Sequence, residues 1–422
     1  MKQHLLAWTT GCCALLALYG SHAAAPADGE LTLDEALARV LEHNPTLQAA
    51  GYDSRAAAAR IRQAAQANPW RAGLELENLA GTGTTRGTDA LETTLSLSRV
   101  LQTGDQPRLR GELARQEAAL LGTEQQAQRL DLLAESAQRF IAVAAAQERI
   151  QLARDARTAA QRSLEVVEHR VQAGRSAQAE RATAAIALAR AGLELAGAES
   201  ELQSARQTLA AGWGDTRAAY TRVTADLYDL PAVMPFATLE AALARNPELA
   251  RFATAERVSE VRVRLARAGR SPDIELAAGV RYLNEPDDAA LVLSASVPLG
   301  TARRAAPAID EAEAQRLREP LAYEERRLAL HSLLFTLHQE LRQQHAAAIT
   351  LRERIIPAAE QALADYRRGY SAGRYGWLEL VNAQNTLRDV RTELLDTAAA
   401  FHRTRIEIER LTGGKLITGD AS

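Results

Sequence analysis

The chain has 422 residues and a formal net charge of −3, and 47% of its residues are hydrophobic but only 4% aromatic. This composition excludes a collagen, a disulfide scaffold and a disordered chain, and it gives no electrostatic reason to expect nucleic acid as a partner. Alanine fills 88 positions, and Ala-rich sequence with Leu, Glu and Arg favours closely packed helices. Beyond the N-terminus, no run reaches the ~20 apolar residues that a membrane helix needs.

Residues 1–23 are predicted to be a secretory signal peptide. Lys2 precedes an apolar stretch over residues 5–19, and small residues follow, which is the order typical of such signals. Cys12 and Cys13, the two cysteines of the chain, fall inside this segment, so the mature chain would have no disulfide and no thiolate ligand. The exact cleavage site and a lipidated Cys12 are left open by the sequence.

The rest of the chain contains two copies of one pattern. Each copy starts with a Thr-Leu segment, at Thr32 and Thr238, and continues to an Asn-Pro pair at Asn44 and Asn246. Later matched landmarks are Leu95–Ser98 with Leu293–Ser296, Ala173–Arg175 with Ala372–Arg374, and Glu180 with Glu379. A period this long indicates a duplicated domain rather than a solenoid of short repeats. The predicted units are residues 30–232, residues 233–415 and a C-terminal tail over residues 416–422.

Each copy is predicted to begin with two helices and two strands. The first helices cover residues 33–42 and 239–244, and the second helices start at the Asn-Pro pairs, which favour a stop followed by a new helix start. They run toward Ala65 and Ala266. Period-two alternation then predicts strands with one apolar face. These strands cover residues 72–77, 91–98, 274–282 and 291–297.

A very long helix is predicted to follow each pair of strands. In the first copy it covers residues 107–172 without an internal proline, and at 1.5 Å per residue it would extend roughly 100 Å. Apolar residues at alternating spacings of four and three predict a coiled-coil seam. The seam residues are Leu130, Ala134, Ala137, Ile141 and Ala144 in the first copy, and Leu330, Leu334, Leu337, Leu341, Ala348, Leu351 and Ile355 in the second.

Prolines and glycines predict where the long helices bend and turn. Pro320 and Pro357 are expected to kink the second copy. Glycine turns at Gly174 and Gly373 are expected to reverse the chain. Each turn leads into a last helix, and these helices end near Gly212 and Gly413.

The four predicted strands are too few to form a closed membrane barrel within one chain. The smallest membrane barrels have eight strands, and lipid does not tolerate the unpaired edges of an open sheet. If the strands meet a membrane, several chains must therefore share one barrel. The alternative, from another functional class of protein, is a soluble periplasmic helical tether or scaffold with incidental hairpins.

In these features the chain resembles the TolC-type outer-membrane efflux family. The resemblance covers Leu31 to about Gly414 and is carried by the duplication, the Asn-Pro-x-Leu landmarks and the segments 356–360 and 370–373. The segment 101–108 is similar to the heavy-metal (cobalt–zinc–cadmium, CzcC-like) branch.

The resemblance implies a mainly α fold with a membrane β-barrel part. Three chains would each give four strands to one 12-stranded barrel in the outer-membrane lipid of a Gram-negative bacterium, and long coiled-coil helices to a periplasmic tunnel. The implied partners are a periplasmic adaptor (membrane fusion) protein and an inner-membrane, proton-driven RND-type pump. The implied function is passive conduction of divalent heavy-metal cations, and the alternative within the family is a duct for drugs or type I protein secretion.

No sequence motif predicts an enzyme, a cofactor or a metal site. The chain lacks a nucleophile elbow, a P-loop, a dinucleotide fingerprint and an HExxH pattern. His331, His338 and His345 share one helix face, but successive members would lie about 10.5 Å apart, too far for one metal ion. We interpret them as a helix face beside the seam, and a weak relay lining the tunnel is the alternative.

The gate and the adaptor contact are predicted at the two helical turns, because these form the far tip of the long helices. In the resembled family, an acidic ring and tyrosine- or arginine-bearing links near this tip hold the tunnel closed. Tyr370 matches the family tyrosine, whereas Tyr375 stands where an arginine is found, next to Arg374. The predicted tip residues are Gly174, Arg175, Glu180, Tyr370, Gly373, Arg374, Tyr375, Glu379 and Asn382.

Glu379 falls on one acidic position of the family, Asn382 falls on the second, and Glu180 repeats the acid in the first copy. Three chains would present six carboxylates around one axis, and such a ring attracts cations. The alternative is that both acids only stabilise a helix N-terminus through its dipole.

Overall fold

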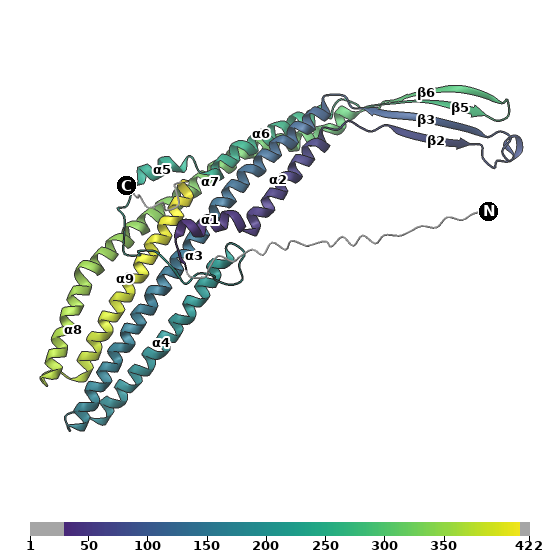
Figure 1. Cartoon of the computed structure of the whole chain (residues 1–422). Coiled ribbons are helices and arrows are strands. Elements are labelled where there is room, and N and C mark those ends of the chain that lie inside the picture. Colours follow the sequence, from purple (N-terminus) through teal and green to yellow (C-terminus); the bar gives the residue numbers. More distant parts are fainter. Residues whose placement is uncertain (1–28, 414–422) are drawn as a thin grey trace, which may run out of the picture.

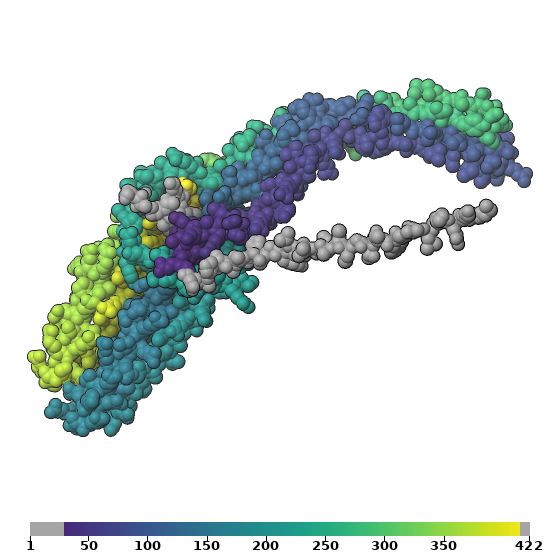
Figure 2. All heavy atoms as spheres, in the orientation of Figure 1, coloured from purple at the N-terminus to yellow at the C-terminus, as the bar shows by residue number. Residues whose placement is uncertain are grey.

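A computed structural model describes residues 29–413 of the chain. The predicted signal peptide with Cys12 and the predicted tail over 416–422 lie outside the described residues. The molecule is elongated, with a β-sheet at one end and two helical turns at the other (Figure 1). The space-filling view shows the same extended body (Figure 2).

The order of elements repeats along the chain, as the landmarks predict. The first copy contains α1 (Leu33–His43), α2 (Pro45–Ala64), β2 (Arg71–Glu77), β3 (Glu92–Leu101), α3 (Gln106–Gln172) and α4 (Gln178–Ala211). The second contains α5 (Phe236–Leu243), α6 (Pro247–Ala268), β5 (Ile274–Leu283), β6 (Asp288–Ser296), α7 (Thr301–Thr350), a π-helical turn (Leu351–Ile355), α8 (Ile356–Ser371) and α9 (Trp377–Thr412). Short β1 (Glu30–Leu31) pairs in parallel with β4 (Arg222–Val223). The unit boundaries inferred from the repeat stay a prediction.

The first landmark, the Thr-Leu segment at Thr32, lies at the start of α1. Thr32 caps the helix, because its hydroxyl accepts the Glu35 N–H at 3.3 Å while the Thr32 N–H donates to the Glu35 carboxylate at 3.0 Å. This reciprocal pair is a capping box. The hydrogen bonds from Thr32 lower the pKa of the Glu35 carboxyl.

The asparagine of each Asn-Pro landmark connects the second helix of its copy to the last helix of the same copy. Asn44 is buried; its Oδ1 accepts the Thr46 N–H at 2.9 Å, and its Nδ2 donates to the Gly212 carbonyl at 2.8 Å. Asn246 repeats the arrangement, since its Nδ2 donates to the Leu411 carbonyl at 2.7 Å. Each asparagine therefore caps the second helix of its copy and ties it to the end of the last helix.

Asn44→Ala is expected to lower the free energy of unfolding by about 2–4 kcal/mol, because it removes a helix cap and leaves a buried carbonyl unpaired. Thermal unfolding followed by far-UV circular dichroism measures the change. Asn44→Asp is the comparison variant, because it keeps the Oδ1 cap but replaces the donor to Gly212 with a carboxylate oxygen. Equal unfolding temperatures for the wild type and Asn44→Ala would contradict the prediction.

The four long strands form one antiparallel sheet in the order β2-β3-β5-β6. In register, Leu74, Leu95, Val280 and Leu291 form a row across all four strands, and each is more than half exposed. The other face is polar, and Arg281 of β5 pairs there with Glu77 of β2 and Glu92 of β3. The predicted amphipathic strands are confirmed, and β2 and β6 are the open edges of the sheet.

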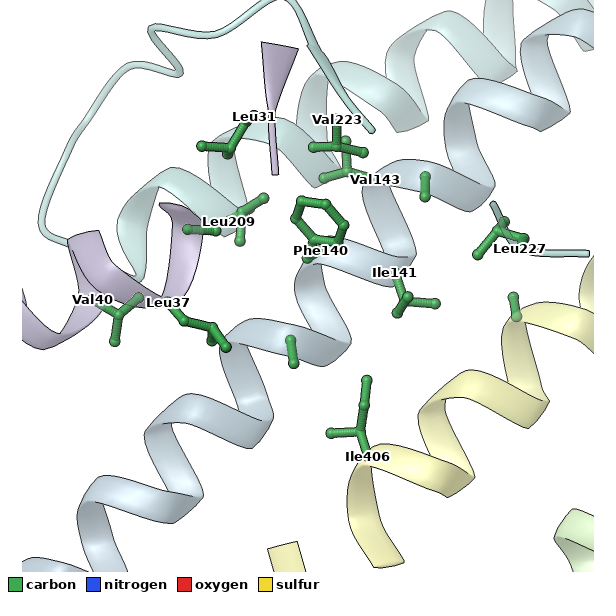
Figure 3. Packing of buried hydrophobic residues seen from close by; sticks show 14 of the residues in the cluster. Leu31, Leu37, Val40, Phe140, Ile141, Val143, Leu209, Val223, Leu227 and Ile406 are labelled. Atoms are coloured by element: carbon green, nitrogen blue, oxygen red, sulfur yellow. The ribbon is translucent and has the colours of Figure 1, made fainter. Parts of the chain in front are cut away.

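The core of the molecule lies where α1, α3, α4 and α9 meet midway along its length. Phe140 on α3 contacts the neighbouring helices together with Val143, Leu209 and Ile406, all of which are at most 2% exposed (Figure 3). The predicted seam on α3 is confirmed at Ala134, Ala137, Ile141 and Ala144, which are buried, whereas Leu130 is half-buried. Within residues 29–413, no helix combines the length and the apolar content needed to cross a bilayer.

The second long helix departs from its predicted seam at one place. α7 continues through Pro320 without interruption, and the kink predicted there stays a prediction. The helical ladder changes in the π-helical turn just before Pro357. Proline lacks an N–H and its ring crowds the carbonyl four residues earlier, and a wider turn relieves both problems. The extra residue shifts the seam by one position. Ile355, predicted to be buried, is 39% exposed, and Ile356 packs instead.

Candidate functional site at the two helical turns

Both predicted glycine turns are present at the far end of the molecule (Figure 1). Gly174 has φ +69° and Gly373 has φ +73°, in the left-handed region that favours glycine. Each turn is closed by a backbone hydrogen bond of 2.8 Å, from Arg175 to Arg170 in the first copy and from Arg374 to Gly369 in the second. The two turns therefore have the same geometry, and helices α3, α4, α8 and α9 share one apolar cluster behind them.

The two predicted acids occupy equivalent positions. Glu180 is the third residue of α4 and Glu379 the third residue of α9. The Glu379 side chain is exposed and folds back over Gly376, where a Cβ would lie only 2.8 Å from Oε2, a position suited to the helix dipole. Glu180 is half-buried, and its Oε2 has no hydrogen-bond partner in the described chain. The structure does not join the two acids, and Asn382 is exposed one turn further along α9.

Tyr370 is the most buried of the predicted tip residues, at 3% exposed. Its ring lies 5.8 Å from that of Trp377, and the Arg170 guanidinium lies 4.4 Å from its centroid. The Arg170 Nη1 also donates to the Tyr370 carbonyl at 2.8 Å, and its Nε donates to Ser176 at 3.1 Å. The tyrosine is thus held by its ring and carbonyl, and its hydroxyl has no partner in the described chain.

Arg170 and Trp377 are tip residues that the sequence pattern did not reveal. Arg170 connects the first turn to the second, since it donates to Ser176 in the first turn and to the Tyr370 carbonyl beside the second. Trp377 is 7% exposed at the start of α9, and its Nε1 has no hydrogen-bond partner among the described residues. Neither residue belongs to a repeated landmark, so only the packing of α3 against α8 and α9 identifies them.

The predicted residues Arg374 and Tyr375 have different roles. The Tyr375 ring covers Gly369 so closely that a Cβ added to Gly369 would lie 2.0 Å from the Tyr375 Cδ2. The centroid of the Tyr375 ring lies 5.0 Å from that of Tyr366. Tyr375 therefore belongs to the packing of the second turn. Arg374 and Arg175 are exposed, and within residues 29–413 their side chains make no hydrogen bond or ion pair.

The histidine face of α7 is covered by the segment around α5. His331 Nε2 lies 3.0 Å from Glu240 Oε1, and His338 Nε2 lies 3.0 Å from the Met234 carbonyl. His338 is buried, so the three histidines do not form a continuous solvent-facing row; His345 packs against Phe401. Among the described residues, no group of three or more histidines and acids is placed to hold a metal ion.

Comparisons with known proteins agree with this architecture. The family model for outer membrane efflux proteins matches residues 36–215 and 238–414. The cobalt–zinc–cadmium resistance protein CzcC of Cupriavidus metallidurans is 28% identical over 388 residues, which cover 92% of this chain and 91% of that protein.

Two solved structures show the same fold. The crystal structure of CusC has a TM-score of 0.73 at 20% identity, covering 90% of this chain and 92% of that one. The outer membrane protein VceC from Vibrio cholerae has a TM-score of 0.73 at 18% identity, covering 91% and 97%. The duplicated helices and strands, the two turns and these matches together place the chain in the outer membrane efflux protein family.

Proposed function

We propose that the chain is the outer-membrane duct of a tripartite efflux system and passively conducts divalent heavy-metal cations. One observation supports the duct. A sheet with an exposed apolar face lies at one end of the long helices, and the helical turns lie at the other end. α3 has 67 residues and extends roughly 100 Å. This length carries the chain from the outer membrane deep into the periplasm, where the turns meet a periplasmic adaptor protein.

The open edges of the sheet support a homotrimer. Lipid does not tolerate the unpaired backbone of β2 and β6. Three chains of four strands give twelve, within the range of known barrels, whereas two chains give eight, a barrel that its own side chains nearly fill. The mass of the detergent-solubilised protein tests this. A monomeric mass with conduction in bilayers would overturn the proposal.

The similarity to a cobalt–zinc–cadmium resistance protein supports metal cations as the cargo. In this proposal the proton-driven inner-membrane pump supplies the energy, and the duct has no enzymatic activity. A deletion strain tests the cargo. It should become sensitive to cobalt, zinc or cadmium, and the wild-type gene should restore tolerance. Sensitivity to drugs alone would favour drug export, and recovery in the soluble periplasmic fraction would overturn the duct.

The acids at the turns are proposed to attract cations at the tunnel entrance. Glu180→Gln with Glu379→Gln removes six carboxylates from a trimer, and we expect the cation-to-anion permeability ratio to fall by about twofold or more. Reversal potentials in planar bilayers under a salt gradient measure the ratio.

The matched control is Glu199→Gln with Glu325→Gln, which removes the same charge at exposed positions away from the turns. An unchanged ratio in the turn variant would leave both acids with only a structural role at their helix starts.

A further inference from the structure

A cavity of about 610 Å³ lies between α3, α8 and α9, just behind the second turn. Tyr370 and Trp377 line it. Both side chains are more than nine-tenths buried, and the Tyr370 hydroxyl and the Trp377 indole N–H have no hydrogen-bond partner in the described chain. Buried polar groups without partners are unfavourable, because folding removes their hydrogen bonds to water without replacing them. Two such groups beside one cavity therefore point to a ligand that supplies an acceptor.

The rim of the cavity adds positive charge. Arg162 from α3 and Arg367 from α8 line it; both are exposed, and within residues 29–413 neither side chain makes a hydrogen bond or ion pair. Arg388 and Arg391 also line it, but they pair with Asp389 and Glu360.

The cavity contains few acceptors to satisfy these donors. Asp155 is its one acid, and that carboxylate already accepts a hydrogen bond from Gln151 at 3.2 Å. The Ser163 hydroxyl accepts from Gln384 at 2.9 Å. Four arginines and one acid line the cavity, so the net charge of its lining is positive.

We infer that this cavity binds a small oxyanion, either a carboxylate or a phosphate. The Tyr370 hydroxyl and the Trp377 N–H would donate to the anion from the buried side, and Arg162 and Arg367 would close over it. Guanidinium groups suit this ligand, because their planar donors match two oxygens of a carboxylate or phosphate. The bound anion would join α3 of the first copy to α8 and α9 of the second. The inference concerns a site distinct from the conduction of cargo and does not rest on the identity of that cargo.

Isothermal titration calorimetry on the purified full-length protein in detergent tests the site. Sodium phosphate and sodium succinate are titrated separately at constant ionic strength, without adaptor, pump or heavy metal. We expect saturable binding of at least one anion, and which one binds identifies the source. Tyr370→Phe with Trp377→Phe should weaken binding about a hundredfold or more, because two hydrogen bonds to a charged group are lost while an aromatic ring remains at each position.

Arg162→Gln with Arg367→Gln provides a second test at exposed positions, where folding is not at risk, and should also weaken binding about tenfold. Arg318→Gln, an exposed arginine of α7 outside the cavity, should bind as the wild type does. Absence of saturable heat with both anions would overturn the inference, and so would wild-type affinity in the rim variant. Because no metal is present, a failure of the proposed cargo would leave these results unchanged.

Discussion

Leu293→Arg is expected to remove the protein from the outer-membrane fraction. Leu293 on β6 is 71% exposed and continues an apolar row through Ala278 and Leu97. An arginine on the lipid face of a barrel strand costs about 2–4 kcal/mol at the middle of the bilayer, and a trimer would carry three. Fractionation followed by immunoblotting measures the loss.

Ser294→Arg is the matched control, because Ser294 is the next residue of β6 and faces the opposite side of the sheet in register with Ala277. The same charge there would face the barrel interior, so the protein should still be recovered from the outer membrane. Equal recovery of both variants would contradict the assignment of the two faces, and loss of both would show that β6 tolerates no arginine on either.

Arg170→Ala is expected to loosen the junction between the two turns and to raise the open probability of the channel in bilayers. The variant loses the hydrogen bonds to the Tyr370 carbonyl and to Ser176, and also the contact with the Tyr370 ring. A charged hydrogen bond contributes about 1.5–3 kcal/mol and a cation–π contact about 0.5–1 kcal/mol. A shift of this size corresponds to a roughly tenfold or larger change in the closed-to-open ratio.

Two variants make the Arg170 prediction specific. Arg157→Ala removes an exposed arginine of α3 that lies 13 residues before Arg170 and away from the turns, and it should leave gating unchanged. Arg170→Lys keeps the charge above the Tyr370 ring and should give an intermediate open probability, because lysine lacks the planar fork. If Arg170→Ala has the wild-type open probability in single-channel recordings, the junction does not contribute to the gate.

Local patterns were sufficient to predict most of the fold. Alternation of apolar and polar residues predicts a strand over residues 274–282, and β5 covers Ile274–Leu283. The signal is readable because only one face of that sheet is apolar and a strand repeats every two residues. The two Asn-Pro pairs likewise predict helix starts, since the cap and the proline act within one turn of the chain. Such signals are readable because their cause is local in sequence.

Features that depend on distant contacts could not be predicted in this way. The π-helical turn changes which residue of the pair Ile355 and Ile356 is buried, and the heptad pattern alone carries no sign of the inserted residue. Arg170 lies 200 positions from Tyr370, so its role emerges only when α3 packs beside α8. At the turns, the sequence predicted the glycines, the acids and Tyr370, whereas Trp377 and the arginine beside Tyr370 required the three-dimensional packing.

The equivalence of the two turns has a consequence for the evolution of the channel. Counted back from the turn glycine, Arg170 of the first copy corresponds to Gly369 of the second, and Val171 corresponds to Tyr370. An assembly of six identical single-copy chains would place the same residue at every such position, so an arginine–tyrosine contact would form at every junction between hairpins or at none. Gene duplication removes this symmetry constraint. It allows one hairpin to contribute the cation and the other the aromatic ring, so that the contact can form at one kind of junction between hairpins and not at the other.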